Sequence, residues 1–168
     1  VEKPVALSAA ETQEITEAAK ARGVQFAAGH NFLGVPSYQR LKTAVQAGDL
    51  GKVSSVEVTW ALPMGPLRAG PYNLWLLRDP QNLLLELGAH PYAFAVDLLG
   101  ELEILGTQLG QPVTLPGGAV RHQSWRILAR AGAVDVSFNF SLVETYDDRS
   151  VVVRGSSGMA RLDYAADT

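Results

Sequence analysis

Glu86 and His90 are the first pair of residues whose types and spacing could carry out a reaction. On a helix, residues four positions apart face the same way, so the carboxylate could hydrogen-bond the imidazole and hold it in one tautomer. A histidine oriented by an acid is suited to general base catalysis. A structural interpretation stays open, in which His90 is a partly buried helix histidine paired with its neighbour.

Lys3 is the second candidate, because Pro4 restricts the backbone beside it and Glu2 precedes it. A lysine at the carboxyl edge of a sheet can hold a substrate hydroxyl and stabilise negative charge that develops on the oxygen. The alternative is a solvated terminal lysine without a role in chemistry.

His30 and Asn31 belong to a loop, Gly29-His30-Asn31, that follows a short strand predicted over residues 24–28. Ligands gather at the carboxyl ends of strands in α/β sheets, so we expect both residues to contact a substrate. Trp75 is a further candidate, because residues 63–80 contain four prolines and two glycines, and a loop of that length is often a binding loop.

Composition narrows the classes of function. The 168 residues are 47% hydrophobic and 18% charged, a balance that can fill a core. A net charge of -3 offers no basic surface for nucleic acid. The absence of cysteine excludes disulfides and Cys-based zinc sites, and the three histidines share no ligand spacing, so we expect no metal. No apolar run approaches the length of about 18 residues that spans a bilayer. We expect a cytoplasmic protein with no membrane partner.

The elements that must position these residues follow from periodicity and from glycine and proline punctuation. Helices are predicted over 8–22, from Pro36 to Gly48, and over 83–99, where Pro91 either kinks the helix or marks its start. Strands are predicted over 53–62, 104–109, 119–131, 133–144, 150–155 and 159–164. From about residue 102 onward the strands form an antiparallel meander, with turns between neighbouring strands at 131–132 and 145–148 and a hairpin turn at 155–158. The fold class is α+β, with helices packed on one face of a large, mostly antiparallel open sheet, preceded by a remnant of an α/β layer.

Five short motifs, in this order, resemble one known family. They are Glu2-Lys3-Pro4, Gly29-His30-Asn31, Gly48-Asp49-Leu50-Gly51-Lys52-Val53, Glu86-Leu87-Gly88-Ala89-His90, and Val153-Arg154-Gly155 with Leu162-Asp163. Each is weak alone, but together they span essentially the whole chain and resemble the Gfo/Idh/MocA oxidoreductases, which include glucose–fructose oxidoreductase and inositol dehydrogenase.

The resemblance implies a subunit of two domains, an N-terminal Rossmann domain that binds NAD or NADP and a C-terminal domain that holds the substrate. Residues 1–30 would be the tail of the Rossmann domain, and residues 31–168 a C-terminal substrate-binding and oligomerisation domain that is truncated at its end. Lys3, His90 and Glu86 would be catalytic, and Glu2, Lys3 and Pro4 would lie at the nicotinamide. The implied reaction transfers a hydride between the cofactor and a hydroxyl or carbonyl carbon of a sugar, cyclitol or related polyol.

Departures from the family pattern concern both the site and the cofactor. The acid before the histidine is Glu86 rather than Asp, Pro80-Gln81-Asn82 replaces a glycine-rich triplet, and Ala93 stands where a second acid is usual. No Gly-x-Gly-x-x-Gly occurs in the chain. A dinucleotide site needs that motif within a βαβ unit, so we expect the chain alone to be inactive.

The same residues suggest two alternatives to this reaction. The first is a non-catalytic, sheet-based ligand-binding or dimerisation module of the same family. The second is a hydrolase using Glu86 and Asp97, which would stand roughly 16 Å apart along a helix, too far for paired carboxylates. Whether or not the family member is catalytic, we expect it to form a homo-oligomer through the sheet, a dimer or a tetramer, because uncovered apolar strands invite pairing.

Overall fold

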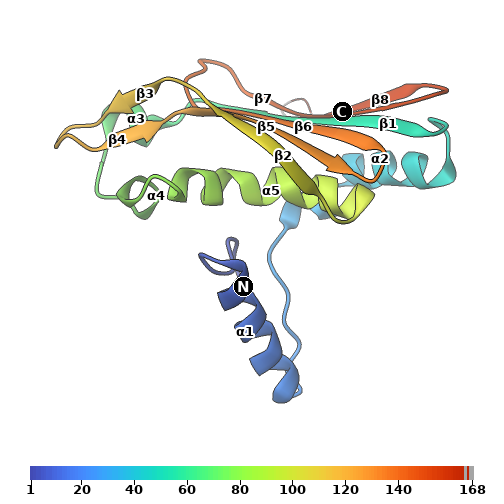
Figure 1. The fold of residues 1–168 in the computed structure, drawn as a ribbon, viewed down its shortest axis with the longest axis horizontal. Helices are drawn as coiled ribbons and strands as arrows, with labels where there is room; N and C mark the ends of the chain where they lie inside the picture. Colours follow the sequence, from blue (N-terminus) through green and yellow to red (C-terminus); the bar gives the residue numbers. More distant parts are fainter. Residues whose placement is uncertain (165, 167–168) are drawn as a thin grey trace.

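The computed structural model describes residues 1–164 and 166, and a six-stranded sheet lies at its centre (Figure 1). The strands run in the spatial order β2-β5-β6-β1-β7-β8. Their bounds are β1 Val53–Ala61, β2 Glu103–Leu109, β5 Ser124–Ala131, β6 Val134–Ser141, β7 Asp148–Gly155 and β8 Met159–Asp163. A separate two-stranded sheet pairs β3, Pro112–Thr114, with β4, Val120–His122.

Helices cover one face of the large sheet (Figure 1). The longest is α5, Asn82–Leu99, and α2, Pro36–Ala47, lies beyond its carboxyl end. The short elements are η1, Asn31–Gly34, α3, Gly65–Ala69, and α4, Trp75–Arg78. Among the described helices, none is long and apolar enough to cross a membrane.

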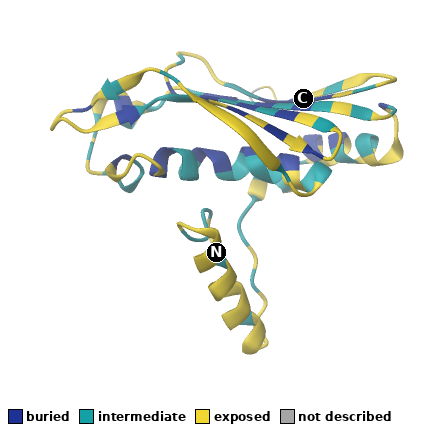
Figure 2. Ribbon diagram, viewed as in Figure 1, coloured by how far each residue is buried: buried dark blue, intermediate teal, exposed yellow. Residues whose placement is uncertain are grey.

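The first helix, α1, Ala9–Ala21, stands apart from the sheet and buries none of its residues (Figure 2). It begins at a cap formed by Ser8: Glu11 N–H donates to Ser8 Oγ at 3.2 Å, and Glu11 Oε2 accepts from Leu7 N–H, one residue before the cap, at 3.0 Å. The bond to Ser8 satisfies an amide that would otherwise be unpaired at a helix start.

The core lies between the helices and the sheet. Along β1 the side chains of Val56, Val58 and Trp60 are buried, while Glu57 and Thr59 between them are only half-buried. This alternation follows from the period of two residues in a strand, and it assigns the apolar side chains to the face that α5 covers. The opposite face of the sheet is open.

The predicted fold class is confirmed, but the predicted meander is wrong in one respect. β1 lies between β6 and β7, parallel to β6 and antiparallel to β7. The turn at 131–132 does join neighbouring strands, whereas the segment at 145–148 connects two strands that β1 separates. The apolar side chains of β1 favour a central place, where both of its edges are paired and one face is buried.

Three predictions about single segments are corrected. Residues 24–28 form no strand, because a strand needs a ladder of backbone bonds and the segment 24–29 pairs with the chain start only through Ala27 O and Gly29 N. The loop 63–80 contains the short helices α3 and α4. The strand predicted over 119–131 is divided into β4 and β5, which belong to different sheets.

Two of the sequence motifs meet in space although about 100 residues separate them. Lys52 N–H donates to Ser156 Oγ at 3.0 Å, and Ser157 N–H donates to Leu50 O at 2.9 Å. A Cβ on Gly155 would collide with the carbonyl of Leu50, so this close approach requires glycine. Residues 155–158 form the predicted hairpin turn, closed by a bond from Gly155 N–H to Gly158 O at 2.8 Å.

Candidate active site at the start of helix α5

Helix α5 supplies Glu86 and His90, and it runs without interruption through Pro91. Of the two alternatives left by the sequence, a helix that begins at Pro91 is therefore excluded. Pro91 is itself buried and has no N–H to donate to the preceding turn. Glu86 and His90 thus stand one turn apart on the same side of one helix.

Lys3 reaches α5 from the start of the chain. Its Nζ donates to the Glu86 carboxylate at 2.8 Å and to the Glu86 main-chain carbonyl at 2.9 Å. The Lys3 side chain is 12% exposed and that of Glu86 is 36% exposed. Within the described part of the chain, the Glu86 carboxylate binds Lys3, and the expected hydrogen bond from the His90 imidazole to Glu86 is not formed. The ammonium is the stronger partner, because both groups carry full charge.

His90 lies against aromatic rings. The ring of Phe32 meets its imidazole edge-on, with centroids 4.6 Å apart, and the ring of Trp60 lies at 6.1 Å with an interplanar angle of 31°. The Nδ1 atom of His90 is buried and has no hydrogen-bond partner among the described residues. Burial and the nearby charges of Lys3 and His30 lower the pKa of His90 from 6.5 to about 4, although the Glu86 carboxylate opposes this. The imidazole is therefore neutral at pH 7.

His30 is brought to the same place by the segment that precedes it. The amino group of Val1 donates to Ala27 O at 3.0 Å and Gly29 N–H donates to Val1 O at 2.8 Å, so residues 27–29 lie beside the chain start that carries Lys3. The Nδ1 atom of His30 is also buried and has no partner in the part of the chain that the structure describes. Lys3, His30, Glu86 and His90 therefore form one cluster.

The other residues predicted to belong to the site differ in how they are placed relative to this cluster. Glu2 and Pro4 flank Lys3 along the chain, and Asn31 opens η1 with an exposed side chain. Trp75 begins α4, seven residues before the start of α5, and its carbonyl accepts a 2.8 Å bond from Asn82 Nδ2. In the described ring contacts, Trp75 is not a member of the group around His90.

The carboxylate that the hydrolase alternative would need is occupied. Asp97 accepts from Tyr38 Oη at 2.6 Å and from Lys42 Nζ at 2.8 Å. Burial would raise the pKa of Asp97, but these two bonds outweigh it and lower the pKa. Asp97 thus ties α2 to α5 and does not act with Glu86. Across the described residues, no three acidic or histidine side chains gather as a metal site would require.

A comparison with models of protein families identifies the family of this chain. Residues 38–161 match the model of the GFO/IDH/MocA C-terminal domain. The chain belongs to the GFO/IDH/MocA family. The matched segment begins two residues into α2 and ends within β8, so it covers the other five strands of the large sheet in full and the helix that carries Glu86 and His90.

Individual relatives in the GFO/IDH/MocA family are longer than this chain. An uncharacterized oxidoreductase, YrbE of Bacillus subtilis (strain 168), is 28% identical over 172 residues, covering 99% of this chain and 48% of the relative. A dTDP-3,4-didehydro-2,6-dideoxy-alpha-D-glucose 3-reductase of Streptomyces violaceoruber is 30% identical over 109 residues, covering 64% of this chain and 31% of the relative. The chain thus spans about half the length, or less, of these relatives.

A solved structure has the same fold as this chain. An oxidoreductase from Agrobacterium radiobacter, in complex with NAD+, L-tartaric acid and magnesium, superimposes with a TM-score of 0.80 at 16% identity, covering 96% of this chain and 47% of that one. At this identity the match shows a shared fold.

The aromatic residues around His90 are the part of the site that sequence reasoning missed. Phe32 comes from η1, Trp60 from β1 and Tyr164 from the end of β8, and their rings contact one another at 5.4–5.9 Å. The three tryptophans of the chain are scattered along the sequence, and Trp60, 4% exposed, is a residue of the core. No spacing in the sequence indicates that it packs on His90.

Proposed function

We propose that the protein to which this chain belongs is an NAD(P)-dependent oxidoreductase that interconverts a hydroxyl and a carbonyl group of a sugar, cyclitol or related polyol. Membership of the GFO/IDH/MocA family supports redox chemistry, and the deoxysugar reductase among the relatives supports a sugar substrate. The observation that carries the proposal is the cluster itself, in which Lys3 Nζ bonds to Glu86, which lies 83 residues later in the chain and one turn of α5 before His90. The cytoplasmic location predicted from the sequence is part of this proposal.

The residues present fit one end of the cofactor. A lysine and two buried imidazole nitrogens, on His30 and His90, that have no hydrogen-bond partner among the described residues form a polar cluster beside aromatic rings, as a nicotinamide ring and a substrate would require. Lys3, with its neighbours Glu2 and Pro4, would lie at the nicotinamide. When bound, NAD(P) supplies the hydride acceptor or donor. The glycine-rich segment that would hold the pyrophosphate does not occur in this chain, so we propose that the chain alone is inactive.

Lys3 would hold the substrate oxygen. Its ammonium has three protons, of which two are donated to Glu86, so one is left to donate to a hydroxyl or carbonyl oxygen. Negative charge that develops on that oxygen is stabilised by the fixed ammonium, and the two bonds to Glu86 remove the cost of orienting it during the reaction.

His90 would accept the hydroxyl proton of an alcohol and return it when a carbonyl is reduced. Its imidazole is neutral at pH 7, so a ring nitrogen is free to accept a proton. Glu86 lies one turn away and favours the protonated form, since its charge raises the pKa of His90. In this role Glu86 acts on both partners, through a direct bond to Lys3 and through its charge on His90.

The division of the chain is also a proposal. Residues 1–30 would belong to a Rossmann domain, which is consistent with an α1 that buries none of its residues and with a family match that begins at residue 38. Residues 31–168 would form the substrate domain.

Self-association through the sheet would use its apolar edge. All residues of the edge strand β2 are exposed, and Ile104, Leu105 and Leu109 are each about half exposed. The strand 103–109 contains no proline or lysine to discourage pairing with a second copy. Sedimentation of the full-length protein with Leu105→Lys should show a smaller particle than the unaltered protein.

A second candidate is a non-catalytic member of the same family. The low pKa of His90 favours it, because a group with a pKa of about 4 is a weak base at pH 7. Such a protein would bind a sugar and show no turnover with either cofactor.

The experiment that separates the two candidates is turnover by the full-length protein with NAD and NADP and a panel of cyclitols and sugars. His90→Ala should abolish most of the rate, whereas His122→Ala should not, since His122 lies in β4 and bonds to Gly110 O. If an active protein keeps its rate with His90→Ala, His90 is not the base. If substrate binds and no oxidation or reduction is measured, the non-catalytic candidate holds.

A further inference from the structure

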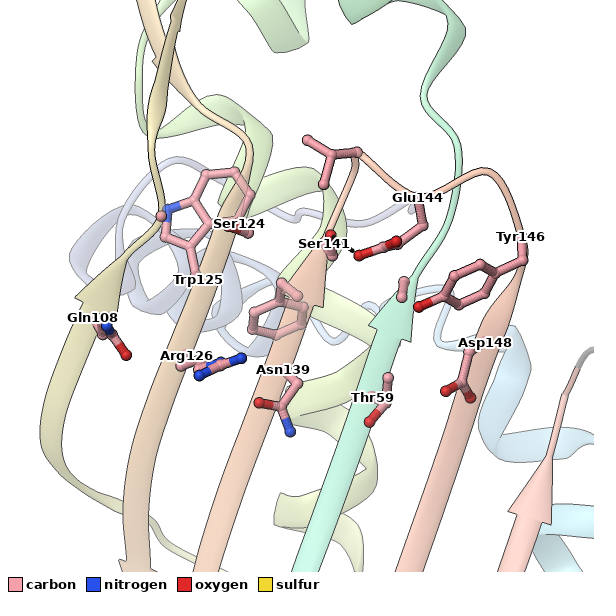
Figure 3. Close-up of a pocket in the computed structure, with 14 residues that line it drawn as sticks. Thr59, Gln108, Ser124, Trp125, Arg126, Asn139, Ser141, Glu144, Tyr146 and Asp148 are labelled. Atoms are coloured by element: carbon pink, nitrogen blue, oxygen red, sulfur yellow. Dashed lines mark hydrogen bonds between the residues drawn. The ribbon is translucent and has the colours of Figure 1, made fainter.

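An arginine lies on the helix-covered face of the sheet, beside the aromatic rings that surround His90. Arg149 of β7 pairs directly with Trp60 of β1, and residues paired directly across two strands point to the same side. Their neighbours along the strands, Thr59 and Asp148, line a pocket on the other face of the sheet (Figure 3). Because successive side chains of a strand alternate between the two faces, Arg149 and Trp60 both point to the face that α5 covers.

The guanidinium of Arg149 is fixed in two ways. Its Cζ atom lies 5.7 Å from the centre of the Trp60 ring, which is the arrangement of a cation–π contact. Its Nε and Nη2 atoms donate to the two carboxylate oxygens of Asp147, each at 2.7 Å. These two parallel bonds hold the plane of the guanidinium, and the Arg149 side chain is 27% exposed.

Two arginines of the other face are held more loosely. Arg154, on the same strand as Arg149, pairs with Glu57 at 3.3 Å, and Arg130 pairs with Asp135 at the same distance. Both arginine side chains are about half exposed, and ion pairs of this kind contribute little to stability. Arg149 is thus oriented more firmly than either of them, and it is oriented against the ring of a core residue.

The Trp60 ring packs in turn on the imidazole of His90, with ring centroids 6.1 Å apart and an interplanar angle of 31°. A histidine that transfers protons is commonly oriented by a hydrogen bond to its other ring nitrogen. Among the described residues, however, Nδ1 of His90 has no hydrogen-bond partner, and the Glu86 carboxylate bonds to Lys3. The orientation of the imidazole therefore depends on its packing against the rings of Trp60 and Phe32.

We propose that Arg149 is a positioning residue for His90. Its guanidinium, held by Asp147, fixes the ring of Trp60, and that ring fixes the imidazole. The inference rests on the proposed function, in which His90 accepts and returns the proton of the substrate hydroxyl. In this role Arg149 does not touch the reacting atoms. Its removal lowers the rate of proton transfer, because the imidazole then adopts orientations that do not reach the hydroxyl, and it leaves substrate binding intact.

Steady-state kinetics of the full-length protein test the effect on the reaction. Arg149→Met keeps an apolar stem against Trp60 and removes the cation together with its bonds to Asp147. In this variant kcat should fall by about tenfold or more, while KM should change by less than about twofold. Arg149→Lys keeps a cation but cannot make two parallel bonds, so its kcat should lie between those of Arg149→Met and the unaltered protein. The control Arg154→Met, on the same strand and the opposite face, should change neither constant.

A second measurement follows the imidazole itself and needs no turnover. The ring currents of Trp60 and Phe32 shift the imidazole C–H resonances of His90 as long as the rings are fixed. In the labelled full-length protein, Arg149→Met should move these resonances toward the values of a free histidine, and Arg154→Met should leave them in place. A non-catalytic protein would still show this change, so failure of the inference and failure of the proposed function can be told apart. If Arg149→Met does not fold, Asp147→Asn should give the same changes with smaller amplitude, because it keeps the shape of the partner and removes its charge.

Any of three results would overturn the inference. The first is that Arg149→Met leaves unchanged either the kcat of an active protein or the imidazole resonances of His90. The second is a raised KM with an unchanged kcat, because Arg149 would then bind the substrate directly. The third is an equal effect of Arg154→Met, because the loss of any ion pair on β7 would then be sufficient.

Discussion

The ammonium of Lys3 donates to two acceptors on a single residue, the carboxylate of Glu86 at 2.8 Å and its main-chain carbonyl at 2.9 Å. One bond depends on the side chain of Glu86 and the other depends only on the path of α5. Lys3 is therefore held against the helix that carries His90 by two bonds of different kinds. A longer acid than the aspartate usual in the family can fill this position, because what it must reach is the lysine and not the histidine.

Removal of the Lys3 ammonium is expected to reduce kcat. Lys3→Met keeps most of the length of the side chain and removes the proposed donor to the substrate oxygen, so on this proposal kcat of the full-length protein should fall by about 100-fold or more. The measurement is steady-state turnover, with Lys20→Met on the exposed helix α1 as the control. An unchanged kcat would show that Lys3 does not contact the reacting oxygen.

The titration of His90 should shift in opposite directions in two variants. The charge of Lys3 lowers the pKa of His90 and that of Glu86 raises it. Lys3→Met should therefore raise the pKa from about 4 toward 6.5, and Glu86→Gln should lower it further. The pKa can be measured from the imidazole C–H chemical shifts of the labelled full-length protein. Shifts of the same sign in both variants would contradict the electrostatic arrangement of the cluster.

Acid should weaken the folded state through His90. Its folded pKa, about 4, lies below the unfolded value of 6.5, so in this window the unfolded chain binds a proton that the folded chain does not. The contribution of neutral His90 to stability is thus fully present above about pH 6.5 and is lost as the pH falls toward 4. Denaturant unfolding of the full-length protein at several pH values should show that the free energy of unfolding falls less steeply with decreasing pH for His90→Asn than for the unaltered protein. Parallel curves would mean that His90 does not titrate in this way.

Gly155 should tolerate no side chain. A Cβ there would overlap the carbonyl of Leu50, a backbone atom that cannot rotate away, whereas a Cβ on Gly106 of β2 would meet open space. Gly155→Ala should lower the free energy of unfolding by about 1–3 kcal/mol, and Gly106→Ala should change it by less than about 0.5 kcal/mol. The free energies of unfolding are measured with denaturant. Equal effects of the two substitutions would show that the close contact between residues 50 and 155 does not constrain position 155 to glycine.

Local signals predicted the helices well. The predicted helix start at residue 8, the proline at position 36 and the glycine at 48 mark ends that the structure confirms, because each acts on backbone groups within a few residues. Periodicity likewise predicted the approximate bounds of β1 and of most of the strands that follow α5.

Contacts between residues that are distant in the sequence could not be predicted from such local signals. The sequence alone determined which residue types are available for chemistry and where most of the helices and strands lie, because those signals are short-range. The tertiary structure decided that β1 enters the middle of the sheet, that Glu86 binds Lys3 instead of His90, and that Phe32 and Trp60 surround the imidazole. These pairings depend on how faces of separate elements pack and on which charge comes nearest, and neither is set by spacing along the chain.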